Sequence, residues 1–440
     1  MDLEFIPLDY EPFDFNDENY VRIYGRSKDG KRVCLIDKVE AYFWAILKDD
    51  LSDKKIEEIS EKIEKIKIHS NIRTTRVIKT ELHSRKFLEH DVKAIKIFIT
   101  NYKDAPDVAD KIAFEEVVKR REHDLGTITR YIMDRKLSPL KWHRISGKLL
   151  DKHNNLYGTN SKINADLMIE LDKIEYLDER KSSEPFLLRV IAYDIETDEF
   201  EVGKGKILMI SLYGDSYDGR GKLKKVLTWK KDADKLGLNF VEHCKNEAEM
   251  LEKFRDCIKK EDPDVLVGYF SDSFDFPYIK ERARLLKVEL SIGLDNSLPR
   301  SSGARRQSVR IDGIVHLDLF RFIEVNYSQY LQSETLSLNE VSSELLGEKK
   351  LDFEFKHSSK LTKEEWKNYF KYNLQDSVLT YKLCNKTWQD IMEFSRVTHK
   401  PLFEMSRDGM STHVEDFILH NLYRFNEIAE KRPIHDEIGE

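Results

Sequence analysis

The sequence is poor in the features that mark membrane, secreted and disulfide-bonded proteins. Its four cysteines lie far apart and form no C-x-x-C pair, which argues against a zinc site or a disulfide framework. No apolar run approaches the roughly 20 residues that span a bilayer. The acidic start MDLEFIPLDYEPFDF lacks the basic and apolar regions of a signal peptide. These absences predict a cytoplasmic protein without a membrane partner.

Glycine and proline are also scarce, with 18 and 10 residues in a chain of 440, whereas 40% of the residues are hydrophobic. This composition excludes a fibrous or disordered chain and allows two or three globular domains. The net charge of −7, taken alone, argues against a nucleic-acid partner. Binding depends on local patches, however, so the net charge does not decide the question.

Two patterns organise the N-terminal third of the chain, residues 1–145. Ile56, Ile59, Ile63 and Ile66 recur at helical spacing after Ser52, a candidate helix N-cap. The segment KAIKIFIT (93–100) alternates apolar and polar residues, as a half-buried strand does. These residues are predicted to form an α+β domain. The polar residues 146–183 are predicted to be a linker or an insertion.

Residues 184–386 read as an α/β domain with a mixed sheet. FLLRVIAYD (186–194) is typical of a strand buried on both faces, and KILMISLYG (206–214) and KKVLTW (224–229) favour two more strands. A helix is expected over 247–260, a strand over 264–270 and another helix from about residue 276. After residue 361 the pattern is helical almost throughout.

Four carboxylates in this region are the candidate site. Asp194 and Glu196 are two apart on the first strand, so their side chains point the same way. Two neighbouring carboxylates repel each other, and a divalent cation such as Mg²⁺ or Mn²⁺ relieves that repulsion. A turn with two solvated acids explains the same D-x-E triplet.

The other two carboxylates also have simpler explanations. Asp275 stands at the start of a helix, where an Asp can serve as an N-cap; the aromatic residues around it fit a core or a base-stacking surface. Tyr372 and Asp376 are four apart on one face of a helix, and an exposed Asp beside a half-buried Tyr is equally common there. Together, the four acids match the two-cation arrangement of phosphodiesterases.

These segments resemble the archaeal type of family B DNA polymerases. AYDIET (192–197), YFSDSFDFPYI (269–279) and YNLQD (372–376) resemble the three exonuclease motifs of that family in order and spacing. Further similar segments include AYFWAILKDD (41–50), HDLGTITRYIMDRKL (123–137) and SRDGMSTHVEDF (406–417). The resemblance therefore covers nearly the whole chain.

The resemblance implies an RNase H-like 3′→5′ proofreading exonuclease domain over 184–386, after a template-binding-like domain over 1–145. It implies two Mg²⁺ or Mn²⁺ ions on Asp194, Glu196, Asp275 and Asp376, with Tyr372 positioning the attacking water. DNA would be contacted by Phe274 and Thr197, and by Arg305 and Arg306 in a hairpin over 299–313, where Arg310 is a further candidate. A solvated loop explains the same arginines equally well. Residues 387–440 would pack on the N-terminal domain and lead to the palm.

Three departures from the family qualify these expectations. The 440 residues contain none of the palm motifs DxxSLYPS, KxxxNSxYG and YxDTD, so no DNA synthesis by this chain alone is expected. A split polymerase with a separately encoded palm and thumb, or a truncated chain, would explain this. Phe270 stands where the second motif has Asn. Ala41 and Ala109 replace the Pro and Arg of the template-uracil pocket.

Three functions follow as hypotheses. The first is a metal-dependent 3′→5′ exonuclease acting on single-stranded or mismatched DNA ends, as part of a polymerase. The second is a non-catalytic subunit that binds DNA and docks a separate palm. The third is a stand-alone repair nuclease, which would leave the helices over 401–433 without a partner to pack on.

Overall fold

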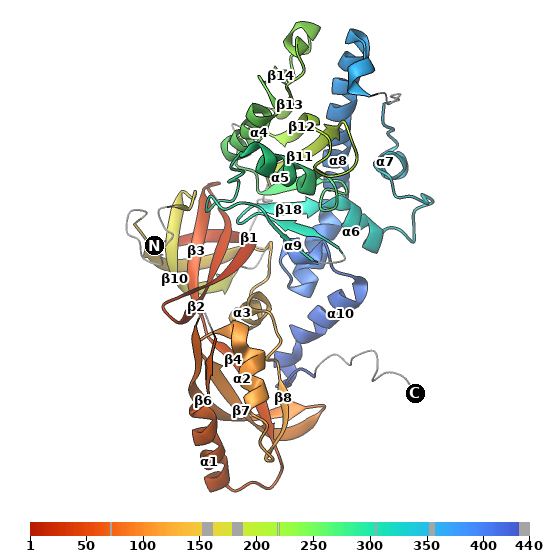
Figure 1. The fold of residues 1–440 in the computed structure, drawn as a ribbon. Coiled ribbons are helices and arrows are strands. Elements are labelled where there is room, and N and C mark those ends of the chain that lie inside the picture. The colour runs from red at the N-terminus through yellow and green to blue at the C-terminus, as the bar shows by residue number, and fades with distance from the viewer. Residues whose placement is uncertain are drawn as a thin grey trace.

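The computed structural model describes residues 1–70, 73–151, 162–177, 188–217, 219, 221–303, 306–351 and 357–430. Figure 1 shows an elongated molecule: the N-terminal strands and helices form its lower half, the mixed sheet its upper half, and the last helices return downwards along one side. No helix among the described residues is long and apolar enough to cross a membrane.

A closed barrel of strands lies at the centre of the molecule. Its strand order is β1 (Asp2–Phe15), β2 (Glu18–Ser27), β3 (Arg32–Val39), β10 (Leu167–Tyr176) and β9 (His143–Leu149), and β9 pairs back onto β1. Side chains such as Phe5, Ile23 and Ile169 fill its interior. Closure pairs every strand on both sides, so the barrel has no exposed sheet edge.

The barrel differs from the expectation of a linker over residues 146–183. Strand β10 pairs in parallel with β3 and antiparallel with β9, so it completes the N-terminal barrel. Its sequence LMIELDKIEY alternates apolar and polar residues over 169–172 and again over 174–176, but a β-bulge between Leu171 and Lys173 interrupts the alternation. Residues 152–161 and 178–183 of the expected linker or insertion lie outside the described part.

A second sheet, ordered β5 (Lys67–His69), β6 (Thr74–Phe87), β7 (His90–Ile99), β4 (Ala41–Leu47) and β8 (Val117–Arg121), forms the lower end. Helices α1 (Asp53–Glu64) and α2 (Ala105–Lys111) contribute to its core, and α3 (Thr127–Arg135) leads back to the barrel. The Ser52 side chain accepts from the Lys55 N–H and begins α1, as predicted. Ala41 and Ala109 both lie in this core.

The upper half is an α/β domain around a six-stranded mixed sheet, as expected. The strands are ordered β14 (Val241–His243), β13 (Lys222–Thr228), β12 (Ile207–Asp215), β11 (Val190–Thr197), β15 (Val265–Gly268) and β18 (Val315–Asp318). Strand β12 is antiparallel to both neighbours, whereas β11, β15 and β18 are parallel. The carboxyl ends of these three parallel strands therefore meet at one edge of the sheet.

Helices cover both faces of this sheet (Figure 1). Phe254 of α4 (Glu247–Glu261) and Phe276 of α5 (Asp275–Leu286) pack on the face that carries Ile191, Tyr193 and Ile195. The opposite face of β11 carries Val190 and Ala192 and packs on the 36-residue helix α8 (Lys363–Thr398). The Thr362–Glu365 capping box begins α8. Helix α8 continues without interruption through residue 386, where the sequence predicted a domain boundary.

Shorter elements connect these layers. They are η1 (Tyr102–Asp104), η4 (Ala233–Leu236), β16 (Arg300–Ser302), β17 (Ser308–Arg310), α6 (Leu319–Asn326), α7 (Leu338–Leu346), η5 (Ser358–Lys360), α9 (Leu402–Met405), α10 (Met410–Leu419) and η6 (Leu422–Phe425). β16 and β17 form the expected hairpin. Beyond η6 the chain returns to β6, where the Ile428 N–H donates to the Lys86 carbonyl.

Buried ion pairs join the barrel to the sheet domain. Arg26 Nε lies 2.7 Å from Asp264 Oδ1, and an Arg32 guanidinium nitrogen lies 2.9 Å from the same oxygen. All three side chains are almost fully buried. Asp262 pairs with the same two arginines and with Arg189. Since charges this deep are costly unless paired, the two domains are held in one orientation.

Candidate active site

Strand β11 presents two carboxylates to helix α8. Side chains alternate along a strand, so Asp194 and Glu196 belong to the face of Val190 and Ala192, which packs on α8. Both acids lie within β11 near its carboxyl end, and both are partly buried. The alternative of a solvated turn therefore does not apply.

Asp376 meets these two acids from α8. One carboxylate oxygen from each of Asp194, Glu196 and Asp376 lies within 4.8 Å of the others. Asp376 is 3% exposed, so it is not the exposed helix residue of the simpler explanation. The strand pair and the helix residue, 180 positions apart in the chain, converge on one point.

Asp275 lies close by but outside that group of three. It is the first residue of α5, and Phe274 occupies the N-cap without a side-chain hydrogen bond. The Asp275 carboxylate instead accepts from the backbone N–H of Ile195 at 3.2 Å. The N-cap explanation is thereby excluded. The bond ties the start of α5 to β11, between Asp194 and Glu196.

Two further residues of α8 donate hydrogen bonds to the strand carboxylates. The Tyr369 hydroxyl donates to Glu196 Oε2 at 2.9 Å, and the Asn373 amide donates to Asp194 Oδ2 at 2.7 Å. Tyr369, Asn373 and Asp376 are spaced four and three apart, so they share one face of the helix. Tyr369 and Asn373 were not identified from the sequence, although their helical spacing from Asp376 could have indicated them.

The ammonium group of Lys350, which was not identified from the sequence, completes the cluster. Lys350 Nζ lies 2.6 Å from Asp376 Oδ2 and 3.3 Å from the hydroxyl of Tyr372. Lys350 follows α7 in a stretch without regular structure. Because neither periodicity nor a motif marks that stretch, no local pattern connected this lysine to the acids.

The electrostatics of the cluster favour a bound cation. Burial, followed by repulsion from Asp376, raises the pKa of Glu196 to about 8. Burial raises the pKa of Asp275 to about 7, and it raises the pKa of Asp376 to about 6, against the opposing effect of Lys350. The pKa of Asp194 is raised well above its ordinary value by burial and by Asp376. Without a cation, these carboxylates hold protons that acids in water would release.

The donor set fits a hard divalent cation. Asp376 Oδ1 is buried and accepts no hydrogen bond from the described residues, although a buried carboxylate oxygen ordinarily has a partner. All the clustered ligand atoms are carboxylate oxygens, the atoms that Mg²⁺ and Mn²⁺ prefer. Asp194, Glu196 and Asp376 are therefore suited to hold one ion directly, with Asp275 beside them.

The residues predicted to contact DNA differ from one another in burial and in their partners. Phe274 is half-buried against Tyr278, and the Thr197 hydroxyl donates to the Glu199 carbonyl at the end of β11. Arg306 is exposed and pairs with Glu324 at 2.9 Å. Arg305 lies outside the described residues.

Arg310 differs from its expected role as a phosphate contact. Its guanidinium pairs with Asp9 of the barrel at 2.7 Å and with Glu404 at 2.6 Å. Its side chain is largely buried. Since both carboxylates already neutralise this cation, Arg310 joins the hairpin to the barrel and to α9.

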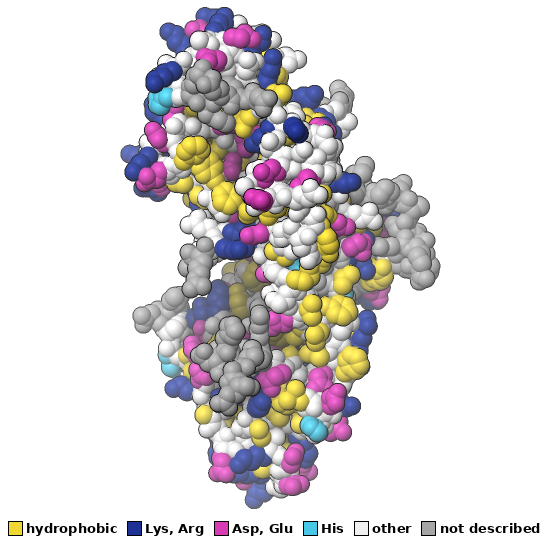
Figure 2. Space-filling model, turned by 90° about the vertical axis from the view of Figure 1, so that its right-hand side faces the viewer, with side chains coloured by type: hydrophobic (Ala, Val, Ile, Leu, Met, Phe, Trp, Pro, Cys, Tyr) yellow, Lys and Arg dark blue, Asp and Glu magenta, His cyan; other side chains and the backbone are white. Residues whose placement is uncertain are grey.

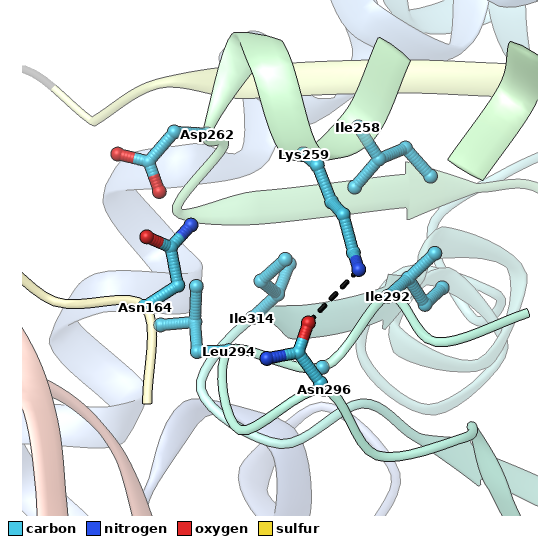
Figure 3. A pocket seen from close by; sticks show the side chains of 9 residues that line it. Asn164, Ile258, Lys259, Asp262, Ile292, Leu294, Asn296 and Ile314 are labelled. Carbon is cyan, nitrogen blue, oxygen red and sulfur yellow. Dashed lines mark hydrogen bonds between the residues drawn. The ribbon is translucent and has the colours of Figure 1, made fainter. Parts of the chain in front are cut away.

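Two other features of the described residues carry no comparable chemistry. A small pocket beside the end of α4 is lined by both aliphatic and polar side chains, and Lys259 donates to Asn296 across it at 2.9 Å (Figure 3). None of the site acids lines it. A second acidic group contains Glu11, Asp295 and Asp312. Arginines offset part of its charge: Arg22 pairs with Glu11, and Arg300 pairs with Asp312.

Comparisons with known proteins agree with this architecture. Residues 118–341 match the model of the family "DNA polymerase family B, exonuclease domain". The chain is 28% identical over 440 residues to a DNA polymerase of Pyrococcus horikoshii, covering 98% of this chain and 30% of the relative. It is 28% identical over 446 residues to a DNA polymerase of Desulfurococcus sp. (strain Tok), covering 100% of this chain and 49% of the relative.

Among solved structures, the fold is similar to that of the family B DNA polymerase from the archaeon Pyrobaculum calidifontis. The TM-score is 0.79 at 22% sequence identity, over 98% of this chain and 52% of that one. The chain thus spans about half the length, or less, of the relatives it matches.

Proposed function

Because the chain belongs to the family B DNA polymerases, through their exonuclease domain, we propose that it removes nucleotides from the 3′ ends of DNA in a metal-dependent reaction. The substrate would be a single strand or a mismatched, frayed primer end, as in proofreading. The observation that carries the proposal is the convergence of Asp194, Glu196 and Asp376 within 4.8 Å. Two of these acids, Asp194 and Glu196, lie within residues 118–341, which match the exonuclease-domain model.

The residues of the site have separate tasks in this proposal. Asp194, Glu196 and Asp376 hold one divalent cation, and Asp275 contributes to holding a second. Bound cations of this kind supply an activated water and stabilise the leaving 3′ oxygen. Tyr369 and Asn373 fix the strand carboxylates through their hydrogen bonds. Such outer contacts orient ligands and tune their basicity.

Tyr372 and Lys350 act on the other side of Asp376. The Tyr372 hydroxyl lies beside the Lys350 ammonium, which keeps that hydroxyl close to the carboxylate group. A phenolic hydroxyl at this position donates to or accepts from a water that approaches the scissile phosphate. Lys350 also offsets part of the negative charge that would repel the phosphate backbone. The DNA strand itself would be contacted by Phe274, Thr197, Arg305 and Arg306.

The proposal is tested with the purified chain, Mg²⁺ and a single-stranded oligonucleotide labelled at its 5′ end. A 3′→5′ exonuclease gives a ladder of shortened labelled strands, whereas the opposite polarity releases the label as a mononucleotide. Asp194→Ala should abolish the ladder. Asp312→Asn, which alters a buried acid of the second acidic group, serves as the matched control and should retain it. No metal-dependent shortening, or equal shortening by Asp194→Ala, contradicts the proposal.

We also propose that a polymerising partner docks on α10. Met410, Val414, Phe417 and Ile418 of this helix are between 44% and 54% exposed, and their spacing places them on one side of the helix. Figure 2 views the molecule from the side on which α10 lies. Hydrophobic side chains gather on the lower half of the molecule in this view. The relatives of this chain are about twice its length or longer. The proposed occupant is a separately encoded palm and thumb.

Isolation of the tagged chain from its own cells tests this partner. A copurifying polypeptide with the palm motifs, lost on Phe417→Asp, supports the proposal. The control is Phe200→Asp, which alters an 88% exposed phenylalanine that is distant from α10 in the sequence. A chain that itself continues into the palm motifs contradicts a separate partner. A nuclease that purifies alone and whose behaviour is unchanged by Phe417→Asp favours a stand-alone repair function.

A further inference from the structure

Phe270 is an exposed aromatic residue in a backbone conformation that phenylalanine rarely adopts. Its φ angle is +61°, in the left-handed region that bulky side chains avoid. It is 46% exposed, whereas Phe276 and Tyr278 of the same segment are fully buried. A strained residue that leaves nearly half of its surface exposed points to a use outside the folded core.

The fold holds this residue rigidly. The backbone N–H groups of Phe270 and Asp272 donate to the two oxygens of the Asp318 carboxylate, at 2.9 and 3.0 Å. Asp318 is 1% exposed. The Phe270 carbonyl accepts from the N–H of Phe274 at 3.1 Å. Phe270 therefore projects from a pinned turn and not from a loose loop.

The ring of Phe270 has one aromatic neighbour among the described residues. Its centroid lies 5.1 Å from that of Phe320, and the planes are nearly perpendicular, at 84°. Edge-to-face contact of this kind orients a ring. With 46% of the residue still exposed, ring surface remains available to a ligand.

The strand register places Phe270 at the edge that bears the carboxylates. Ala192 of β11 is level with Val267 of the parallel strand β15, and β15 ends at Gly268, so the turn at Phe270 follows the same edge of the sheet to which β11 carries Asp194 and Glu196. Five residues later, Asp275 is bonded to the Ile195 backbone. One turn thus carries an exposed ring at its beginning and a site acid at its end.

We propose that Phe270 is a base-stacking residue that positions the strand whose 3′ end lies at the carboxylates. This inference rests on the proposed function and specifies how that site grips its substrate. An aromatic face binds any nucleobase through its π surface and needs no positive charge. Such a contact suits a nuclease that must accept every sequence, beside a cluster of acids. The ring replaces the Asn that the resemblance led us to expect at this position.

Phe270→Gly and Phe270→Trp test the proposal with purified chain and single-stranded oligonucleotides. Glycine adopts a positive φ without strain, so Phe270→Gly should raise the melting temperature. Loss of one stacked base should nevertheless raise KM by about tenfold, with kcat changed less than about twofold by the same principle. Phe270→Trp keeps an aromatic ring at this position and should have the KM of the wild-type chain. Phe425→Gly, at a 66% exposed phenylalanine on η6, should leave the KM unchanged.

A substrate series identifies the base. Oligonucleotides with one abasic site, moved stepwise from the 3′ end, should show one position at which the wild-type KM rises about tenfold and Phe270→Gly is insensitive. Equal sensitivity of both proteins at every position overturns the proposal. The proposal is also overturned if Phe270→Gly has the KM of the wild-type chain but associates more weakly with a copurifying protein.

A binding measurement separates this inference from the proposed function. The fluorescence of 2-aminopurine at the identified position should be quenched on binding to Asp194→Ala, and Phe270→Gly in that background should remove the quenching. Absence of metal-dependent shortening by the wild-type chain contradicts the exonuclease, whatever the fluorescence shows. Quenching that survives Phe270→Gly contradicts the stacking role, whatever the nuclease assay shows.

Discussion

Lys350 Nζ lies 2.6 Å from Asp376 Oδ2, and the two residues are separated by 26 positions in the chain. This ammonium is the counter-charge that the structure provides for Asp376. It also lies within hydrogen-bonding distance of Tyr372, so one lysine links an acid of the candidate metal centre to the residue proposed to orient water.

Replacement of this lysine should affect stability and cation binding in opposite directions. Lys350→Met leaves Asp376 buried without its partner, so in EDTA the free energy of unfolding should fall by about 3 kcal/mol. Mg²⁺ should recover more stability in the variant than in the wild type, because the added ion replaces the lost charge. Urea unfolding with and without Mg²⁺ measures both effects. Lys349→Met, at the exposed neighbouring residue, is the control; an equal response of the two variants would contradict the prediction.

The stability of the metal-free protein should decrease as pH rises from 5 to 8. The pKa values of Asp376, Asp275 and Glu196 are raised to about 6, 7 and 8 in the folded protein. Between their ordinary values and these, the folded state binds protons that the unfolded state has released. The free energy of unfolding therefore falls with rising pH.

Thermal unfolding in EDTA at successive pH values checks this direction. Glu196→Gln should flatten the dependence between pH 6 and 8, because it removes one of the titrating groups. Saturating Mg²⁺ should flatten it as well, since the ions displace the protons. A melting temperature that rises with pH in EDTA over this range would show that the carboxylates are already ionised.

The two tyrosines of α8 should differ in their effects on catalysis. Tyr369→Phe removes the hydroxyl that donates to Glu196, so the Mg²⁺ concentration for half-maximal activity should rise about tenfold. Tyr372→Phe removes the hydroxyl proposed to orient water, so kcat should fall about a hundredfold with little change in Mg²⁺ dependence. Mg²⁺ titrations of the nuclease rate separate the two. Tyr381→Phe, further along the same helix, serves as the control, and indistinguishable profiles would refute the division of roles.

The buried ion pairs between barrel and sheet domain should be essential to folding. Asp264→Ala leaves Arg26 and Arg32 without the carboxylate that both contact, so stability should fall by about 3–5 kcal/mol. Glu4→Ala removes the partly exposed partner of Lys28, and its cost should stay below about 1 kcal/mol. Urea unfolding of both variants gives the comparison. Equal losses would mean that the buried network contributes no more than a surface pair.

Much of the fold followed from local patterns in the sequence. Ile56, Ile59 and Ile63 marked α1, and the alternation over 93–100 marked β7, because burial on one side leaves a periodic trace in the residues themselves. Strand β10 left only a broken trace, because a β-bulge between Leu171 and Lys173 interrupts its alternation. Its placement depends on closing the barrel with β9 and with β3, and β3 is distant in sequence.

By itself the sequence determined the family and predicted the four acids of the candidate site. A period of two on a strand puts Asp194 and Glu196 on one side, and the motif order supplied Asp275 and Asp376. Only the tertiary structure decided that Asp275 turns its carboxylate to Ile195, that Lys350 joins the cluster and that Phe270 stays exposed. Each of these depends on contacts between segments remote in sequence, and such contacts leave no periodic signal in either segment.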